Sequence, residues 1–325
     1  MQNNDIVRQR NYNNVQLAID IIRGKWLLSD AEALLPQAFN FISHQTSELR
    51  PLLYQPFAYA ETGEYYDAFS DKSGEDQKVV VIPMHGPLTK YWGCATVGTL
   101  DVASDLLEFA SRNDVIGFVL DIDSPGGASN AVPPMLEAIK KVQEKGKPII
   151  AHGDMVSSAA YWIASQCDAI FLDNNLSQAG SIGAYASFLD EREDKQTGTR
   201  LISVYALESG DKNRSYREAL DGKYELCQEE LSELVKEFHR AVTANRPKLN
   251  KEADGVLSGA LFNASKAVEN GLADGIMPLS ECVGNVFIRA DKIVLYGSKE
   301  ISFKQQDGQI GRPSSRQDRA GCKGR

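Results

Sequence analysis

The chain has 325 residues, which allows one large domain or two moderate ones. Hydrophobic residues make up 42% and charged residues 24%, an ordinary balance that excludes a chain disordered throughout. Acidic residues outnumber basic ones by 44 to 35, for a formal charge of −9. This balance argues against general nucleic-acid binding, because such binding needs a positive face.

The sequence also argues against a membrane anchor and a metal centre. It contains no run of 18 apolar residues, so we expect no transmembrane helix. The polar first residues predict no secretory signal. The five cysteines and four histidines are too scattered to form a zinc site by spacing. We therefore expect a reduced, cytoplasmic, metal-free protein.

The first 75 residues differ in character from the rest. Apolar residues recur at helical spacing over 15–22 and 31–42, which predicts a helical N-terminal region. The stretch 58–77 is polar and contains glycine and several tyrosines, so we expect a linker poor in strands.

Short β-branched runs alternate with helical patterns after residue 78. Strands are expected at 79–83, 116–121, 148–152, 169–172 and 202–205. Helices are expected at 100–110, 131–144, 157–167 and 228–246. This alternation predicts an α/β domain over 76–290 with a largely parallel sheet.

The C-terminal part, 291–325, is expected to be a polar, disordered tail. Residues 292–296 could form one last strand. Residues 305–325 have almost no apolar content and cannot contribute to a core.

Two glycines follow the expected strand 116–121, in the sequence Asp-Ile-Asp-Ser-Pro-Gly-Gly over 121–127. Gly126 and Gly127 allow a sharp turn in which backbone N–H groups approach a ligand. Such amides can stabilise a developing oxyanion. A plain tight turn explains the same residues.

Two serines, Ser157 and Ser158, stand between the expected strand 148–152 and the following helix. A serine at a helix start lies near unpaired amides, which suits a nucleophile. It equally suits a helix N-cap. A third small-residue turn, 179–183, follows the next strand.

A nucleophilic serine needs a base. His85, His152 and His239 fit poorly, since the first two are on or near strand ends and the third lies inside a helix. A lysine can act as the base if its neutral form is favoured. Lys212 is the candidate, although a loop lysine is ordinarily only a solvated charge. The residues alone leave the choice open.

Taken in chain order, these segments resemble the signal peptide peptidase A (protease IV) family of Ser–Lys peptidases, which includes the prohead proteases of tailed phages. The resemblance covers roughly residues 79–285. Its matching segments are 123–127, 157–162, 180–183, 210–212, 257–262 and 267–274.

The resemblance implies a ClpP/crotonase-like spiral of ββα units. It makes Ser158 the nucleophile and Lys212 the general base. Ser157 is a minor rival, because Ala159 and Ala160 stand where family members more often have two glycines.

The resemblance further implies acyl-enzyme chemistry on extended peptides, without a cofactor. It assigns backbone N–H groups to the oxyanion hole and a following turn to substrate binding. The oxyanion residues are Gly126, Gly127 and Ala159, and the substrate-binding residues are Ser181, Ile182 and Gly183.

The biological role that we expect is phage or prophage head maturation, with scaffold and capsid proteins as substrates and a homo-oligomeric enzyme in the host cytoplasm or prohead. One alternative is a cytosolic bacterial peptidase of the same family, and another is a non-catalytic scaffold-binding homologue. An acyl-CoA enzyme using Asp123 or Asp154, and a Ser-His-Asp peptidase using His239, are further rivals on the same fold.

Overall fold

The computed structural model describes residues 54–69, 76–91, 97–186 and 202–307. In these residues one nine-stranded sheet has the order β10-β9-β7-β6-β3-β1-β2, with β8 beside β7 and β11 beside β8. Its central strands are parallel and almost entirely buried, as expected for the sheet of an α/β fold. They are β3 (Lys78–His85), β6 (Val115–Ser124), β7 (Ile149–Ser157) and β8 (Ala169–Leu172).

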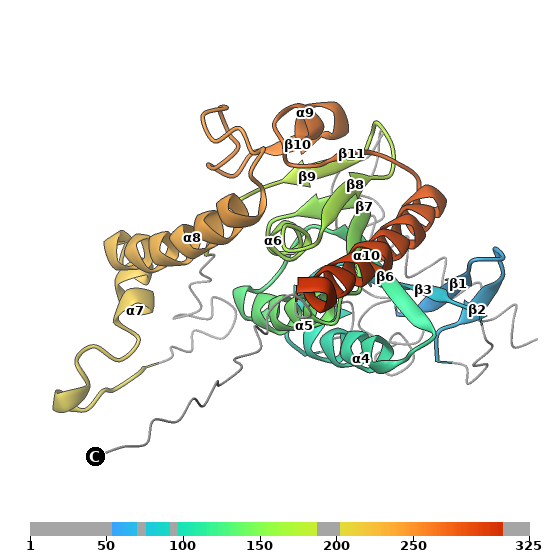
Figure 1. Ribbon diagram of the computed structural model, residues 1–325. Helices are drawn as coiled ribbons and strands as arrows, with labels where there is room; N and C mark the ends of the chain where they lie inside the picture. Colours follow the sequence, from blue (N-terminus) through green and yellow to red (C-terminus); the bar gives the residue numbers. More distant parts are fainter. Residues whose placement is uncertain (1–53, 70–75, 92–96, 187–201, 308–325) are drawn as a thin grey trace, which may run out of the picture.

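Helices cover both faces of this sheet (Figure 1). Alternate residues of β3 point to opposite faces, so Val80 and Ile82 join one core cluster while Val79 and Val81 join another. The first cluster packs against α4 (Thr99–Ser111), α5 (Val132–Glu144) and α6 (Ala159–Ala164). The second packs against α10 (Leu279–Asp307). The α/β class is therefore confirmed, whereas the ClpP/crotonase-like spiral stays a prediction.

Smaller elements complete the described chain. Antiparallel strands β9 (Gln178–Gly180) and β10 (Leu261–Asn263) form one edge of the sheet. The remaining elements are short: β4 (Leu88–Thr89), β5 (Val97–Gly98), η2 (Ser129–Ala131), α9 (Ala264–Glu269) and β11 (Gly275–Ile276). In the described residues, no helix combines the length and hydrophobicity needed to span a membrane.

The linker expected at 58–77 is wrong in its first half. Antiparallel strands β1 (Phe57–Ala60) and β2 (Tyr65–Asp67) extend the sheet beyond β3. The period-two pattern of β1 is hidden in the sequence, because small alanines occupy its buried positions while Phe57 and Tyr59 occupy partly exposed ones. The rings of Phe57 and Tyr65 lie 5.0 Å apart and connect the two strands.

Two of the expected strands are also wrong. Residues 292–296 continue α10, so 291–307 is helical rather than a disordered tail. Residues 202–205 form no strand, and Val204 is 90% exposed with no neighbouring strand to pair with. The expected helices at 15–22 and 31–42, and the tail from 308 onward, lie outside the described residues.

Helix α8 (Glu225–Asn245) carries a projecting part of the chain. The C-terminal half of α8 packs on α6, where the rings of Trp162 and Phe238 stack with centroids 4.6 Å apart. Its N-terminal half packs against α7 (Arg214–Leu220) and leads away from the sheet (Figure 1). We call residues 207–237, which include η3 (Leu207–Ser209), the arm.

A buried ion pair fixes the base of α8 to the sheet. Arg246 Nη1 lies 2.6 Å from Asp274 Oδ2, and the same carboxylate oxygen accepts the Ile170 N–H from β8 at 2.8 Å. The Arg246 guanidinium also donates to Gly271 O. Nearby, Tyr161 Oη donates to Leu272 O at 2.9 Å and joins α6 to the same region.

The substitution Arg246→Met is expected to lower the free energy of unfolding by about 3–5 kcal/mol, because it leaves a partly buried carboxylate without its partner. Urea denaturation measures this change. Arg240→Met is the control, since its pair with Glu237 is exposed on α8 and should contribute little. Equal effects of the two substitutions would contradict the role given to Arg246.

Candidate active site

Ser158 occupies a strained turn between β7 and α6. Its backbone has φ 53° and ψ −122°, a conformation that non-glycine residues rarely adopt and that is concentrated at functional sites. The Ser158 N–H donates to Gly180 O at 2.9 Å, and the Trp162 N–H donates to Ser158 O at 3.0 Å. The hydroxyl forms no capping hydrogen bond to α6, so the N-cap explanation of this serine is wrong. The neighbouring Ser157 is buried and ends β7.

The glycine turn after β6 touches this serine. Gly126 has φ 104°, and a methyl group added there would lie 2.7 Å from Ser158 Cβ and 3.0 Å from Ala159 N. A methyl group at Gly127 would lie 1.9 Å from Leu88 O. Both positions therefore exclude a side chain, and the backbones of two motifs distant in sequence meet at Ser158.

Two backbone N–H groups beside Ser158 are open. In the part of the chain that the structure describes, no hydrogen bond uses the N–H of Gly127 or Ala159. The Gly126 N–H, in contrast, donates to Ser124 Oγ at 3.1 Å. A pair of free N–H groups next to a strained serine is the arrangement that stabilises an oxyanion. That Gly127 and Ala159 donate to an oxyanion stays a prediction, and Gly126 provides the close approach to Ser158.

The third motif adjoins the same place through Gly180, which accepts the Ser158 N–H. The next residue, Ser181, has φ 55°, and its N–H donates to Ala260 O at 2.7 Å. Ile182 is fully buried, and Gly183 follows it. The structure thus places Ser181, Ile182 and Gly183 beside the Ser158 turn. Their contact with substrate stays a prediction.

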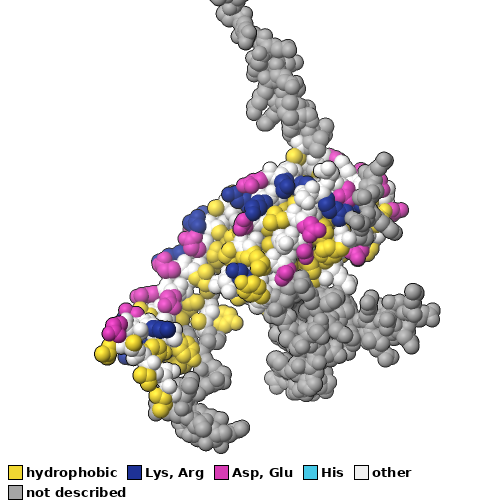
Figure 2. Space-filling model, turned by 90° about the horizontal axis from the view of Figure 1, so that it is seen from below, with side chains coloured by type: hydrophobic (Ala, Val, Ile, Leu, Met, Phe, Trp, Pro, Cys, Tyr) yellow, Lys and Arg dark blue, Asp and Glu magenta, His cyan; other side chains and the backbone are white. Residues whose placement is uncertain are grey.

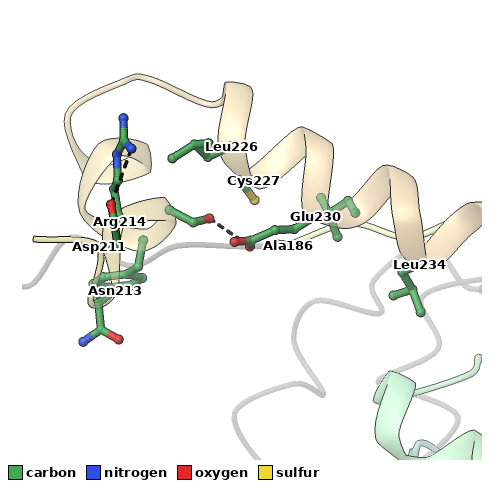
Figure 3. Close-up of a pocket in the computed structure, with 11 residues that line it drawn as sticks. Ala186, Asp211, Asn213, Arg214, Leu226, Cys227, Glu230 and Leu234 are labelled. Atoms are coloured by element: carbon green, nitrogen blue, oxygen red, sulfur yellow. Dashed lines mark hydrogen bonds and ion pairs between the residues drawn. The ribbon is translucent and has the colours of Figure 1, made fainter. Parts of the chain in front are cut away.

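Lys212 is exposed, in the turn between η3 and α7. Arg217 Nη2 donates to Gly210 O at 2.6 Å in this turn. A groove of about 730 Å³ lies beside the contact between α7 and α8. It is lined by apolar residues such as Leu226 and Leu234 and by Glu230 (Figure 3). The chain packs α7 against α8 rather than against α6, so it does not bring Lys212 to Ser158.

The residues of the rival mechanisms, His239, Asp154 and Asp123, lie on three different elements or segments of the chain. His239 lies on α8, and its buried Nε2 forms no hydrogen bond in the described structure. Asp154 Oδ1 accepts a hydrogen bond from Ser177 Oγ at 2.8 Å. Asp123 lies on β6, opposite His85 of β3.

The structure adds a polar cluster that the sequence did not predict. Asp121 of β6 lies between two histidines, with Oδ1 2.8 Å from His152 Nδ1 and Oδ2 3.1 Å from His85 Nε2. The Nε2 atom of His152 lies 3.3 Å from Asp173 Oδ1, just after β8. The available signal was that each residue stands at or near the end of an apolar strand.

These contacts set the charge states in the cluster. Burial opposes ionisation of Asp121, but the hydrogen bonds from His152 and His85 outweigh it and hold the pKa of this carboxyl well below its usual range. Burial, together with the nearby Asp121 and Asp173 carboxylates, raises the pKa of the Cys282 thiol to about 12. The thiol is therefore protonated at neutral pH and is no rival nucleophile.

Comparison with known proteins shows a similarity to one peptidase family. Residues 141–287, which include Ser158, the β9 turn and Lys212, match the sequence model of peptidase family S49. Over these residues the chain is similar to peptidase family S49. The resemblance to the signal peptide peptidase A and protease IV group is thereby confirmed.

Three curated relatives illustrate the match. Protease 4 of Haemophilus influenzae is 29% identical over 184 residues, which cover 56% of this chain and 30% of the relative. Head-tail preconnector protein GP5 of Enterobacteria phage P21 is 26% identical over 240 residues, 70% of this chain and 47% of the relative. The chloroplastic serine protease SPPA of Arabidopsis thaliana is 26% identical over 221 residues, 65% of this chain and 32% of the relative. The matched regions thus span less than half of each relative's length, from 30% to 47%.

The contact between the glycine turn and Ser158 can be tested with two alanine substitutions. Gly126→Ala is expected to lower the free energy of unfolding by about 1–2 kcal/mol for its positive φ and by a further 1–3 kcal/mol for the contact with Ser158. Gly63→Ala is the matched control, because φ is 86° there and an added methyl group would meet no atom within 4 Å. Chemical denaturation compares them. Equal destabilisation would argue against the close approach.

Proposed function

We propose that the chain is a serine endopeptidase in which Ser158 Oγ attacks a peptide carbonyl and forms an acyl-enzyme. The observation that carries this proposal is the strained Ser158 turn with two free N–H groups, those of Gly127 and Ala159, beside it. The serine proton passes to a base during attack and then to the leaving amine, and water releases the acyl group. The similarity to family S49 and to the Protease 4 relatives supports the same activity.

We assign the base to Lys212 and infer that a neighbouring copy of the chain supplies it. Within one chain, Lys212 lies on the arm, away from α6. The arm and the segment before it leave large apolar side chains uncovered: Val204 is 90% exposed and Leu207 98%. Figure 2 shows hydrophobic side chains gathered at the outer end of this projecting part. Exposure of this kind marks an interface.

The substrate proposed for this site is an extended peptide segment of a phage scaffold or capsid protein. The support is the similarity to a phage head-tail preconnector protein over 70% of this chain. The similarity to the bacterial Protease 4 supports a second candidate, a bacterial peptidase with the same chemistry. A comparison of purified scaffold protein with unrelated unfolded protein as substrates distinguishes these roles.

A fluorophosphonate probe tests the dyad directly. The wild-type protein is expected to be labelled at Ser158, at a rate that rises between about pH 6 and pH 10 because only a neutral lysine can accept the serine proton. Lys212→Ala should reduce labelling by about a hundredfold or more. Lys223→Ala, an exposed lysine on the same arm, is the control and should be labelled normally. Peptide mapping locates the label, and a wild type that is unlabelled at every pH would favour the non-catalytic homologue.

Mixing two inactive variants tests where the base comes from. Ser158→Ala retains Lys212, and Lys212→Ala retains Ser158, so sites formed between chains recover one complete pair. Labelling is expected to return in the Lys212→Ala chain after the two are unfolded and refolded together. Recovery should require both variants and increase with the proportion of Ser158→Ala. If no mixture recovers labelling although the wild type is labelled, the base belongs to the same chain as its serine.

A further inference from the structure

A row of polar side chains crosses the α10 face of the sheet. His85 on β3, Asp121 on β6, His152 on β7 and Asp173 after β8 follow one another, with ion-pair distances of 3.1, 2.8 and 3.3 Å. His152 is the buried centre of this row, with only 5% of its side chain exposed. Its two ring nitrogens face carboxylates from the strands on either side. The proposed chemistry at Ser158 uses none of these four side chains.

Directly beyond His152, strand β7 contains a bulge. His152 pairs with Asp121 and Gly153 with Ile122, but the next pair joins Val156 to Ser124, so β7 holds one more residue than β6. On its other side, β7 pairs first with β8, through residues 150–153, and then with β9, through residues 155–157. The change of partner falls at the bulge.

The bulge reverses which residues of β7 face each layer. Before it, Ile150 packs with α10 in the second core cluster. After it, Val156 packs into the first cluster, on the α5 side, although it is also an even-numbered residue. The position of the bulge therefore decides where β7 ends, and so where Ser158 meets the Gly126 turn.

Gly153 permits the bulge, because a methyl group there would lie 2.0 Å from Ile122 O. The apolar residues before it do not fix the register by themselves. Residues 149–151 and their partners 118–120 are all apolar, and a slip of two residues would keep every side chain on its own face. The Asp121–His152 pair opposes that slip, since the slip would separate His152 from the partly buried Asp121 carboxylate and leave only His85 to pair with it.

We propose that His152 is a positioning residue, which through Asp121 fixes the register of β7 on β6 and so holds Ser158 against the Gly126 turn. This inference rests on the proposed function, because its consequence is the reactivity of Ser158. His152 does not touch the reacting atoms. Removal of the His152 ring should change the orientation of Ser158 relative to the reacting group, and should leave the binding of the reagent largely intact.

Two substitutions test separately the roles of the two His152 ring nitrogens. In His152→Asn the side-chain nitrogen takes the place of Nδ1 and keeps a donor toward Asp121. In His152→Gln it takes the place of Nε2 and points toward Asp173 instead. The fluorophosphonate reaction at Ser158 of the full chain yields two constants for each variant, the maximal rate kinact and the reagent affinity KI, per folded molecule.

His152→Gln is expected to lower kinact by about 10- to 100-fold with KI little changed, because small misplacements of a reacting group have effects of that size. His152→Asn should restore kinact to within about threefold of the wild-type value. His85→Asn is the matched control: it removes the Nε2 contact with the same Asp121 carboxylate, but from β3, which carries neither Ser158 nor the glycine turn. It should leave kinact near wild type.

A wild-type kinact in His152→Gln would overturn the inference. So would a loss of labelling that only reflects a smaller folded fraction, or a His152→Asn variant no better than His152→Gln. If His152→Gln does not fold, Asp121→Asn tests the same pair and should also lower kinact with KI unchanged. Failure of the wild type itself to react would instead overturn the proposed function, so the two failures are distinguishable.

Discussion

The close backbone contact between Gly126 and Ser158 is the constraint on which the rest of this structure depends. It requires β6 and β7 to be parallel neighbours, so that both turns leave the same edge of the sheet. It also requires positions 126 and 127 to lack side chains, because Leu88 and Ser158 occupy the space where these would lie. The buried strands and the helices on both faces make this arrangement rigid enough to hold Ser158 at a positive φ.

The two faces of the sheet use different physical means to keep their strands aligned. On the α4–α5 face, apolar residues fill a continuous core that specifies which side chains are buried but tolerates slips of two residues. On the α10 face, the apolar cluster gives way to Asp121 and the two histidines that contact it. A buried carboxylate is tolerable only when it is paired, so this second means specifies one register. The Asp121–His152 pair can therefore specify the register of β7 on β6 even if it adds little to the net free energy of folding.

Most of the central fold could be predicted from the sequence, because it depends on local periodicity. The buried runs that became β3, β6 and β8 are short, β-branched and apolar, and the helices between them follow helical spacing. The predictions failed where a distant partner decides the outcome. Residues 202–205 have the composition of a strand but no neighbour to pair with, and 292–296 continue a helix that begins at Leu279. Strand β1 was missed because its buried positions hold alanine, and β2 because none of its residues is buried.

The candidate site likewise contains residues that the sequence predicted and residues that it did not. The glycines and Ser158 could be found because each motif depends on its own backbone. The Asp121–His152 pair could not, since nothing in either strand indicates that they face each other.

The separation of Ser158 from Lys212 has a consequence for regulation under the proposed mechanism. The nucleophile and its oxyanion donors belong to the rigid sheet, while the base stands on an arm joined to that sheet through the Trp162–Phe238 stack and the C-terminal end of α8. If a neighbouring copy supplies the base, a single chain is inactive however well its serine is aimed. Activity then follows the concentration of the assembled form by mass action. In a closed symmetric ring each arm would serve the next subunit, so every serine would gain a base only when the ring is complete. A peptidase built this way is restrained until its copies are gathered in one place, as they would be inside an assembling phage head.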